Sequence, residues 1–176
     1  DRSRVLDVGA GDGALLAYLV HFKGVDGRGI EIARDGVTAC VSQGLAVIQG
    51  DAEQDLKAYP AGAFDYVILS QTLHAMRDVR GALEQLLRIG RRAVVSFHNF
   101  GHWRMRAYLL LRGRMPLVDG SSWYDTPNIH PSTIDDFLIL TREMGIKIER
   151  AVVLNGRGRQ LGGLGPLANL RAEQAV

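Results

Sequence analysis

The sequence predicts an α/β fold with a mostly parallel seven-stranded sheet and helices on both faces. Short apolar runs alternate with helical patterns, which is typical of parallel sheets. A glycine-rich turn follows the first apolar run, and an acid stands near the end of each of the first three runs. Such sheets bind ligands at the carboxyl ends of their strands, so we expect the site there.

The first strand, turn and helix lie in residues 5–13, VLDVGAGDG, and in the apolar helical pattern that begins at Ala14. Glycine in such a turn lets a ligand approach the backbone closely, because no side chain stands in the way. We therefore predict that Asp7, Gly9 and Gly11 contact a ligand. A tight turn that binds nothing would show the same pattern.

The turn also matches the dinucleotide fingerprint, which places a pyrophosphate at a helix N-terminus. Asp12 stands inside this turn. Its carboxylate would repel a phosphate by roughly 1 kcal/mol or more. S-adenosylmethionine has a ribose and a cationic end without phosphate, so it meets no such repulsion. We expect this ligand, or S-adenosylhomocysteine, rather than a dinucleotide.

Two acids downstream support this expectation. Glu31 follows Gly11 by 20 residues, a spacing at which an acid accepts hydrogen bonds from ribose hydroxyls. Asp51 ends the third apolar run and is placed to accept from an adenine amino group. The alternative for each is a solvated acid that caps the next helix. The remaining predicted ligand contacts adjoin these acids or end the fourth strand: Ile32, Ala52 and Ser70.

The rest of the chain continues the alternation of strands and helices. We predict strands over 28–32, 45–49, 64–70, 92–97 and 147–154, and helices over 34–42, 79–88, 102–112 and 132–144. The last helix opens on a capping box from Ser132 to Asp135. Long loops are expected over 113–131 and, as a mobile hairpin loop, over 155–169.

Composition indicates one ordinary globular domain. The chain has 176 residues, 47% hydrophobic and 23% charged, and its formal net charge of +2 favours no particular partner. No run reaches the length of a membrane span, no signal peptide is evident, and no metal-ligand spacing appears. A single cysteine, Cys40, fits a reducing cytoplasm. Since the chain begins on its first strand, we expect native N-terminal residues to be missing.

Two features leave alternatives open. The histidines at 74, 98, 102 and 130 are candidate bases, or hydrogen-bonded structural residues. Aromatic residues and arginines gather in a segment at about 100–131. This segment is a lid over the ligand, a partner surface or a group packed on the sheet edge. Nucleic-acid binding is disfavoured, because acids follow the arginines and no known nucleic-acid module accompanies them.

The chain resembles the MetW family of methionine biosynthesis proteins. Its motif at 5–13 and GIEI at 29–32 are typical of class I methyltransferases, as is VIQGDAEQDL at 47–56. The segments more specific to MetW are FDYVILSQTLHAM at 64–76, VVSFHNFGHWRMR at 94–106, LLLRGRMP at 109–116 and SWYDTPNIH at 122–130. Two positions depart from the family pattern, His98 for proline and Ala10 for cysteine.

The resemblance implies a Rossmann-like class I methyltransferase fold over residues 1–176, with the aromatic and basic segment as an insertion. It also implies a role beside homoserine O-acetyltransferase. Two functions follow: an S-adenosylmethionine-binding accessory or regulatory subunit of that enzyme, or a methyltransferase acting on a small molecule. The signature NPPY is absent from 70–73, which disfavours methylation of DNA or protein amides. The sequence identifies no methyl acceptor.

Overall fold

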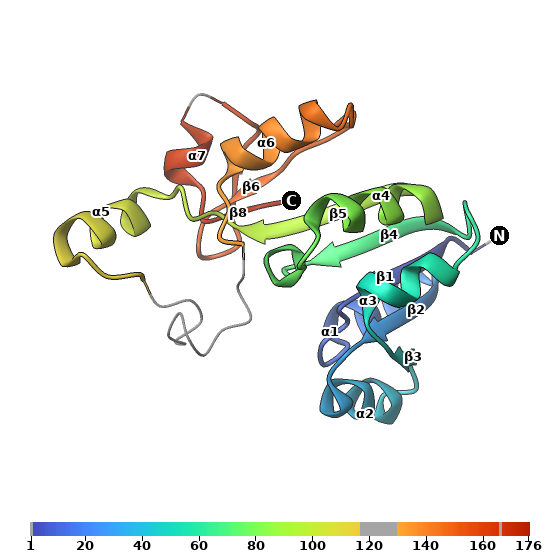
Figure 1. Cartoon of the computed structure of the whole chain (residues 1–176). Helices are drawn as coiled ribbons and strands as arrows, with labels where there is room; N and C mark the ends of the chain where they lie inside the picture. The colour runs from blue at the N-terminus through green and yellow to red at the C-terminus, as the bar shows by residue number, and fades with distance from the viewer. Residues whose placement is uncertain (1, 117–129, 166) are drawn as a thin grey trace. The chain divides into compact units, whose positions relative to one another are not determined.

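The computed structural model describes residues 2–116, 130–165 and 167–176 (Figure 1). The chain divides into two compact units, Asp1–Val95 and Ser96–Val176. The prediction of one domain over the whole chain stays a prediction.

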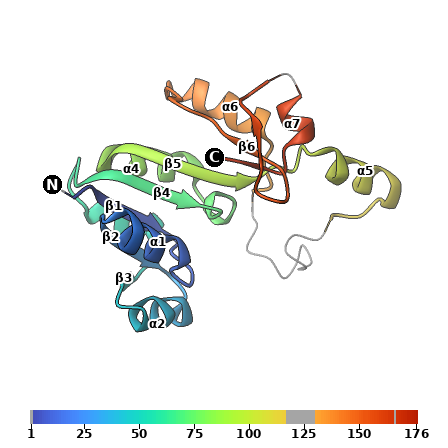
Figure 2. The ribbon, with the colours of Figure 1, turned by 180° about the vertical axis from the view of Figure 1, so that it is seen from behind.

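The first unit contains a parallel sheet with strand order β3-β2-β1-β4. Its strands are β1 Arg4–Val8, β2 Asp26–Glu31, β3 Ala46–Gln49 and β4 Phe64–Ser70. In register, Asp7 of β1 lies between Gly29 of β2 and Ile68 of β4. Figure 2 shows β1 and β4 side by side from behind. Because these strands are parallel, their carboxyl ends lie at one edge of the sheet, as the sequence predicts.

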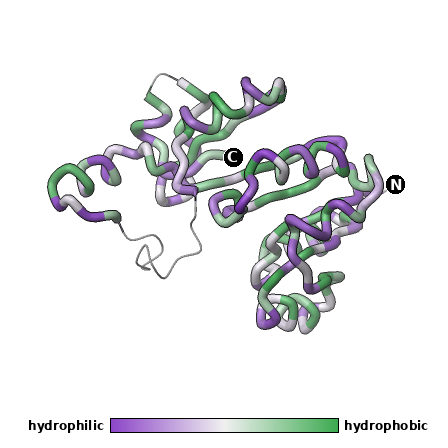
Figure 3. Tube along the Cα trace, in the orientation of Figure 1, coloured by the Kyte–Doolittle hydropathy of each residue, from purple (hydrophilic) through white to green (hydrophobic). Residues whose placement is uncertain are grey.

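Six helical segments follow these strands along the chain. They are α1 Ala14–Lys23, α2 Arg34–Ser42, α3 Ala52–Asp55, η1 Leu56–Ala58, η2 Leu73–Ala75 and α4 Val79–Ile89. Helix α1 packs closely on β2, because a Cβ added at Gly27 or Gly29 would come within 2.8 Å or 3.2 Å of Leu16 side-chain carbons. Leu16 itself is fully buried. Strand β4 is mostly apolar along its length, which Figure 3 shows in green.

The second unit is antiparallel where its strands pair. Strand β5 (Gly90–His98) begins in the first unit and ends in the second, where it pairs with β8 (Gln174–Ala175). Strand β6 (Val153–Leu154) lies between β8 and β7 (Gln160–Gly162). The helices of this unit are α5 Trp103–Arg112, α6 Ile134–Glu143 and α7 Ala168–Arg171. The full strand order is β3-β2-β1-β4-β5-β8-β6-β7.

Three sequence expectations need correction here. The described residues form eight strands, not seven, because the region expected as the 155–169 loop contains β7 and the C-terminus forms β8. The strand expected over 147–154 is confined to Val153–Leu154. The partner strand β8 is also only two residues long. Beyond these paired residues, Val152 and Val176 exchange backbone hydrogen bonds, and the pairing ends there. Strands this short carry too few residues to show an alternating pattern.

The capping box of α6 lies one residue later than expected. Thr133 is the N-cap, and its Oγ1 accepts from the Asp136 N–H at 3.1 Å. Asp136 in turn accepts from the Thr133 N–H at 3.1 Å. The prediction that a capping box starts this helix is confirmed, but the predicted residues, Ser132 and Asp135, are wrong. Of the loop expected over 113–131, residues 117–129 lie outside the described part of the chain.

A buried side chain holds the second unit together. Asn99 is 2% exposed, and its Nδ2 donates to the carbonyl oxygens of Asn169 at 2.7 Å and Ala172 at 2.8 Å. Its Oδ1 accepts from the backbone N–H groups of Gly101 at 3.0 Å and Ile134 at 3.2 Å. One side chain thereby joins the start of α6, the end of β5 and the region of α7.

None of the helices in the described residues has the length and apolar character needed to cross a membrane.

Candidate functional site

The glycine turn lies at the carboxyl end of β1 and is fixed to β2. Gly9, Gly11 and Gly13 all have positive φ, at 77°, 56° and 84°, which disfavours other residues there. The N–H groups of Gly9 and Ala10 both donate to the carbonyl oxygen of Ile30, at 2.9 Å and 3.1 Å. The turn is therefore held by backbone conformation and by hydrogen bonds to the neighbouring strand.

Glu31 holds the same turn through its side chain. Its Oε2 accepts from the Gly11 N–H at 2.7 Å, and its Oε1 accepts from the Ala33 N–H at 2.8 Å. Glu31 is only 8% exposed, so it is not the solvated acid of the alternative interpretation. An ionised carboxylate has about four acceptor positions, so two hydrogen bonds leave capacity for ligand hydroxyls.

The three glycines face different surroundings. A Cβ added at Gly9 would lie 2.6 Å from Thr72 Oγ1, and one at Gly13 would lie 2.8 Å from Cys40 Sγ. A Cβ added at Gly11 would meet nothing within 4 Å. Gly9 and Gly13 are thus required by packing. Gly11 borders open space, which is where a ligand would approach the turn.

Asp7 lies behind this turn with an unsatisfied oxygen. Its side chain is 2% exposed, and within the described structure its Oδ1 has no hydrogen-bond partner. Burial, and then the negative charge of Glu31, raise the pKa of Asp7 to about 7. A buried carboxylate of this kind calls for a proton or a cationic partner. The site therefore fits a ligand that brings a positive charge.

Asp12 already supplies negative charge at the start of α1. Its Oδ1 accepts from the Ala14 N–H at 3.1 Å, in the first turn of the helix. A phosphate bound there would compete with this carboxylate for the same backbone donors. The arrangement supports the expectation that the ligand lacks a phosphate at this point.

Asp51 is the N-cap of α3. Its Oδ1 accepts from the Glu53 N–H at 3.0 Å, and Gln54 Nε2 donates to its Oδ2 at 3.1 Å. The capping alternative is therefore observed for this residue, although capping leaves acceptor capacity for a ligand. The Gly50 N–H donates to the Glu31 carbonyl at 3.0 Å, which holds the ends of β2 and β3 together.

The remaining predicted contacts occupy different surroundings. Ile32, beside Glu31, is 67% exposed, whereas Ala52 and Ser70 are half-buried. The Ser70 carbonyl accepts from Thr72 Oγ1 at 2.9 Å, at the carboxyl end of β4. The ligand roles of these residues stay predictions.

Two residues of the site were not identified from the sequence, Gly36 and Gln43. A Cβ at Gly36 would lie 2.6 Å from the Gly11 carbonyl oxygen, so this glycine lets α2 approach the turn. Gln43 Nε2 donates to the Asp12 carbonyl at 2.8 Å. Of these residues, only Gly36 could have been noticed in the sequence, because a glycine in the first turn of a predicted helix is unfavourable and suggests a packing reason.

Cys40 is a packing residue. It is fully buried in a cluster with Ala10, Leu16 and Leu45. Burial and nearby carboxylates, Glu31 first among them, raise the pKa of its thiol. A thiol with a raised pKa is a poor nucleophile.

The sequence left each histidine as either a catalytic base or a hydrogen-bonded structural residue. The structure gives His102 a structural role. It is buried at the N-cap of α5, where its Nδ1 accepts from the Arg104 N–H at 3.4 Å. Burial lowers the pKa of His102, and its Nε2 lies 4.0 Å from a Glu173 carboxylate oxygen. His74 lies in η2, His98 ends β5, and His130 precedes α6, and their role as bases stays a prediction. Within the described ranges no three His, Cys, Asp or Glu side chains are grouped as for a metal.

Comparison with known proteins identifies the family. The profile of the family described as "Methionine biosynthesis protein MetW" matches residues 1–176. This chain belongs to the MetW family. A curated relative from Rhodopirellula baltica, "Bifunctional methionine biosynthesis protein MetXA/MetW", is 35% identical over 161 residues, which are 85% of this chain. The matched region spans only 26% of that relative's length.

Solved structures show the same fold. A SAM-dependent methyltransferase from Thermotoga maritima, titled a possible histamine N-methyltransferase, is similar with a TM-score of 0.71 and 16% identity. The alignment covers 99% of this MetW chain and 80% of that protein. A SAM-dependent methyltransferase from Archaeoglobus fulgidus aligns with a TM-score of 0.70 and 16% identity, over 99% and 83% of the two chains. The predicted Rossmann-like class I methyltransferase fold is confirmed.

Proposed function

We propose that this MetW chain is a cytoplasmic S-adenosylmethionine-binding subunit that acts with homoserine O-acetyltransferase as an accessory or regulatory protein. The observation that carries the ligand is the buried Asp7 carboxylate behind the open turn at Gly11, whose Oδ1 has no hydrogen-bond partner in the described structure. The partner is supported by the curated relative from Rhodopirellula baltica, a bifunctional protein whose name joins MetXA and MetW. We take MetXA as the acetyltransferase.

In this proposal, three acids of the first unit each contact a different part of the ligand. Glu31 has free acceptor positions for the ribose hydroxyls and keeps the Gly11 turn in place through its own hydrogen bond. Asp51 accepts from the adenine amino group, and Asp7 faces the cationic end. When bound, S-adenosylmethionine supplies an activated methyl group on a sulfonium. The chain needs only to orient it, because the sulfonium carries its own leaving group.

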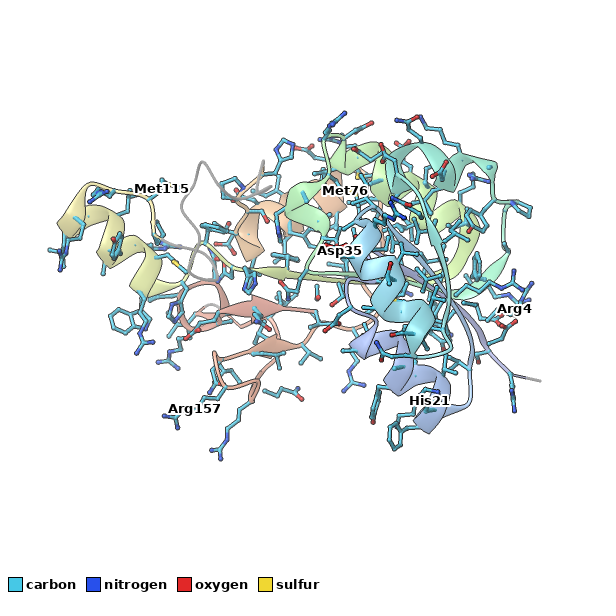
Figure 4. The ribbon with its side chains drawn as sticks, turned by 90° about the horizontal axis from the view of Figure 1, so that it is seen from below. Arg4, His21, Asp35, Met76, Met115 and Arg157 are labelled. Carbon is cyan, nitrogen blue, oxygen red and sulfur yellow. The ribbon has the colours of Figure 1, made fainter. Side chains whose placement is uncertain are left out.

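The second unit supplies the surface for the partner in this proposal. No residue of α5 is buried, and Leu110 and Leu111 are 84% and 80% exposed. Arg104 stacks over the Trp103 ring at 5.6 Å. Figure 4 shows side chains standing out around this helix, with Met115 near its end. Trp and Arg are enriched at interface hot spots, and exposed apolar side chains gathered in one patch are typical of a protein interaction site.

Calorimetry on Glu31 variants tests the ligand assignment. Glu31→Ala removes the ribose acceptor and the acceptor of the Gly11 N–H, so we expect binding of S-adenosylmethionine to weaken by about 1–3 kcal/mol. Asp26→Ala is the matched control, since Asp26 is an exposed acid at the opposite end of β2. Equal affinity in wild type and Glu31→Ala, or tighter binding of NAD than of S-adenosylmethionine, contradicts the proposal.

A second candidate, a methyltransferase acting on a small molecule, is favoured by the fold shared with the two solved enzymes. One experiment separates the candidates. The chain is co-expressed with a tagged acetyltransferase, and release of S-adenosylhomocysteine is measured on the purified complex and on the chain alone. Stable co-purification without release supports the accessory role. Release without co-purification favours the enzyme.

A further inference from the structure

Strand β3 is an edge of the sheet, since no strand lies beyond it among the described residues. The Gly50 N–H donates to the Glu31 carbonyl of β2 at 3.0 Å, so the backbone groups of Ile48, two residues earlier, also face β2. The N–H and C=O groups of Val47 and Gln49 therefore point outward from this edge. Such a row of outward groups is a template for pairing with another strand.

This edge lacks the charges and prolines that commonly prevent such pairing. Residues 42–50, SQGLAVIQG, contain neither. Ile48 is 51% exposed, and Val41 of α2 is also exposed. Strand β7, at the other end of the strand order, is different, because exposed Arg157 and Arg159 precede it and its pairing with β6 is irregular. Of these two edges, β3 is the one that is open to pairing.

The outward groups match a second copy of the same strand. Val47 and Gln49 lie on either side of Ile48, so a two-fold axis at Ile48 sets Val47 of each copy opposite Gln49 of the other. Antiparallel residues in such pairs exchange both N–H···O bonds, so every outward group of the two residues gains a partner. Ile48 then lies opposite Ile48 of the second copy, in a non-hydrogen-bonded pair whose Cα atoms are about 4.5 Å apart.

The charges nearest to β3 do not oppose this pairing. Asp51 follows the strand and would lie opposite Leu45 of the second copy, so roughly 20 Å of strand separates the two Asp51 residues. Salt screens charges at this separation, because the Debye length is about 8 Å at physiological ionic strength. The nearest charged residue before the strand is Asp35, in the first turn of α2. A symmetric pair also closes on itself and leaves no open edge at β3 for further growth.

We propose that two copies of this chain associate through β3, which pairs antiparallel with itself across a two-fold axis at Ile48. This inference goes beyond the proposed function, since it involves neither the glycine turn nor α5. Because each strand is short and buries little surface, the dimer is reversible and its population rises with protein concentration.

The test is sedimentation equilibrium of the ligand-free chain over a series of protein concentrations, which should show monomers and dimers in equilibrium. Ile48→Lys places two like charges at the axis, so we expect the dissociation constant of the dimer to rise at least about 10-fold. Ile139→Lys is the matched control, because Ile139 of α6 is 52% exposed and lies in the second unit. A monomeric wild type, or equal dimer formation by wild type and Ile48→Lys, overturns the proposal, as does equal weakening by both variants.

A disulfide locates the axis. The chain's one native cysteine, Cys40, is fully buried, so an introduced surface cysteine supplies the accessible thiol. The Cα separation expected for the Ile48 pair is within the range of a disulfide, about 4.4–6.8 Å. Under mild oxidation, Ile48→Cys should therefore give a cross-linked dimer and Ile139→Cys should not. Equal cross-linking of the two variants contradicts the axis at Ile48.

Hydrogen exchange of the wild type needs no variant and decides the question if the variants do not fold. Dilution should speed exchange at the Val47 and Gln49 amides, because their N–H groups lose their partners when the dimer dissociates. The Ile48 N–H faces β2 and should exchange at the same rate at both concentrations. Exchange that is unchanged by dilution at Val47 and Gln49 overturns the pairing.

Discussion

One buried polar side chain of each unit, Asn99 in the second and Asp7 in the first, shows a contrast in hydrogen bonding. Asn99 of the second unit and Asp7 of the first are each 2% exposed. Asn99 forms four hydrogen bonds, the full capacity of its amide. Asp7 leaves Oδ1 without a partner in the described structure. Burial alone thus does not indicate function; the difference lies in whether the buried group is satisfied.

This difference assigns different tasks to the two side chains. A satisfied buried amide stabilises one arrangement of the chain, because breaking any of its hydrogen bonds leaves a desolvated group. A buried carboxylate with an unpaired oxygen can gain a hydrogen bond or an ion pair from a bound ligand. The predictions below test this contrast, beginning with the largest expected effect.

Gly11→Val should reduce affinity for S-adenosylmethionine about 1,000-fold or more, since its side chain enters the space that the ligand needs. The control is Gly44→Val, because Gly44 also has positive φ, at 76°, and also faces open space. Both variants carry a similar backbone strain of about 1–2 kcal/mol. Calorimetry should therefore show lost binding only at position 11. Equal affinity in the two variants would make the turn merely structural.

Asn99→Ala should lower the free energy of unfolding by about 3 kcal/mol, because four buried backbone groups lose their partner. Affinity for S-adenosylmethionine should stay within twofold of wild type under native conditions, since the predicted ligand contacts belong to the first unit. Asn155→Ala is the comparison, because Asn155 accepts only from two N–H groups of its own loop. Urea denaturation measures both variants, and equal losses would remove the special role of Asn99.

Trp103→Ala should weaken association with homoserine O-acetyltransferase by about 2 kcal/mol, roughly 30-fold, if α5 is the interface. Trp103 is preferred to Arg106, because Arg106 Nε donates to the Gly101 carbonyl at 2.6 Å and its loss would disturb the fold. Phe22→Ala on α1 is the control, an exposed aromatic residue of the first unit. Co-purification that fails equally for both variants contradicts a specific surface on α5.

Asp7→Asn should leave the stability of the ligand-free chain unchanged near pH 3 and should stabilise it by about 1–2 kcal/mol at pH 5. The pKa of Asp7 is raised to about 7 in the folded chain, above its value of 3.8 in the unfolded chain. The folded state therefore binds more protons between these values, and wild-type stability falls as pH rises through this range. The asparagine variant should lack that decline. Parallel pH profiles of the two proteins in thermal denaturation would show that Asp7 bears no buried charge.

Much of the first unit was predictable from local sequence. The strand before the turn, the glycines and the acids near strand ends follow from patterns within a few residues. The capping box of α6 was found to within one residue, because its hydrogen bonds join positions three apart. Each of these features depends on contacts between neighbours in the chain or on periodicity, which a sequence displays directly.

Other features were decided only by tertiary structure. Strands of two or three residues, β6 to β8, exist because partners brought from elsewhere in the chain complete their hydrogen bonds. Glu31 accepts a hydrogen bond from the Gly11 N–H, while Asp7 Oδ1 has no partner in the described residues, and no local sequence pattern shows either fact.

The sequence by itself determined that a glycine turn and three acids stand at the ends of successive strands, where we predict a ligand site. The tertiary structure decided which of those side chains have hydrogen-bond partners and which have an unpaired oxygen, because hydrogen bonds and desolvation depend on three-dimensional neighbours.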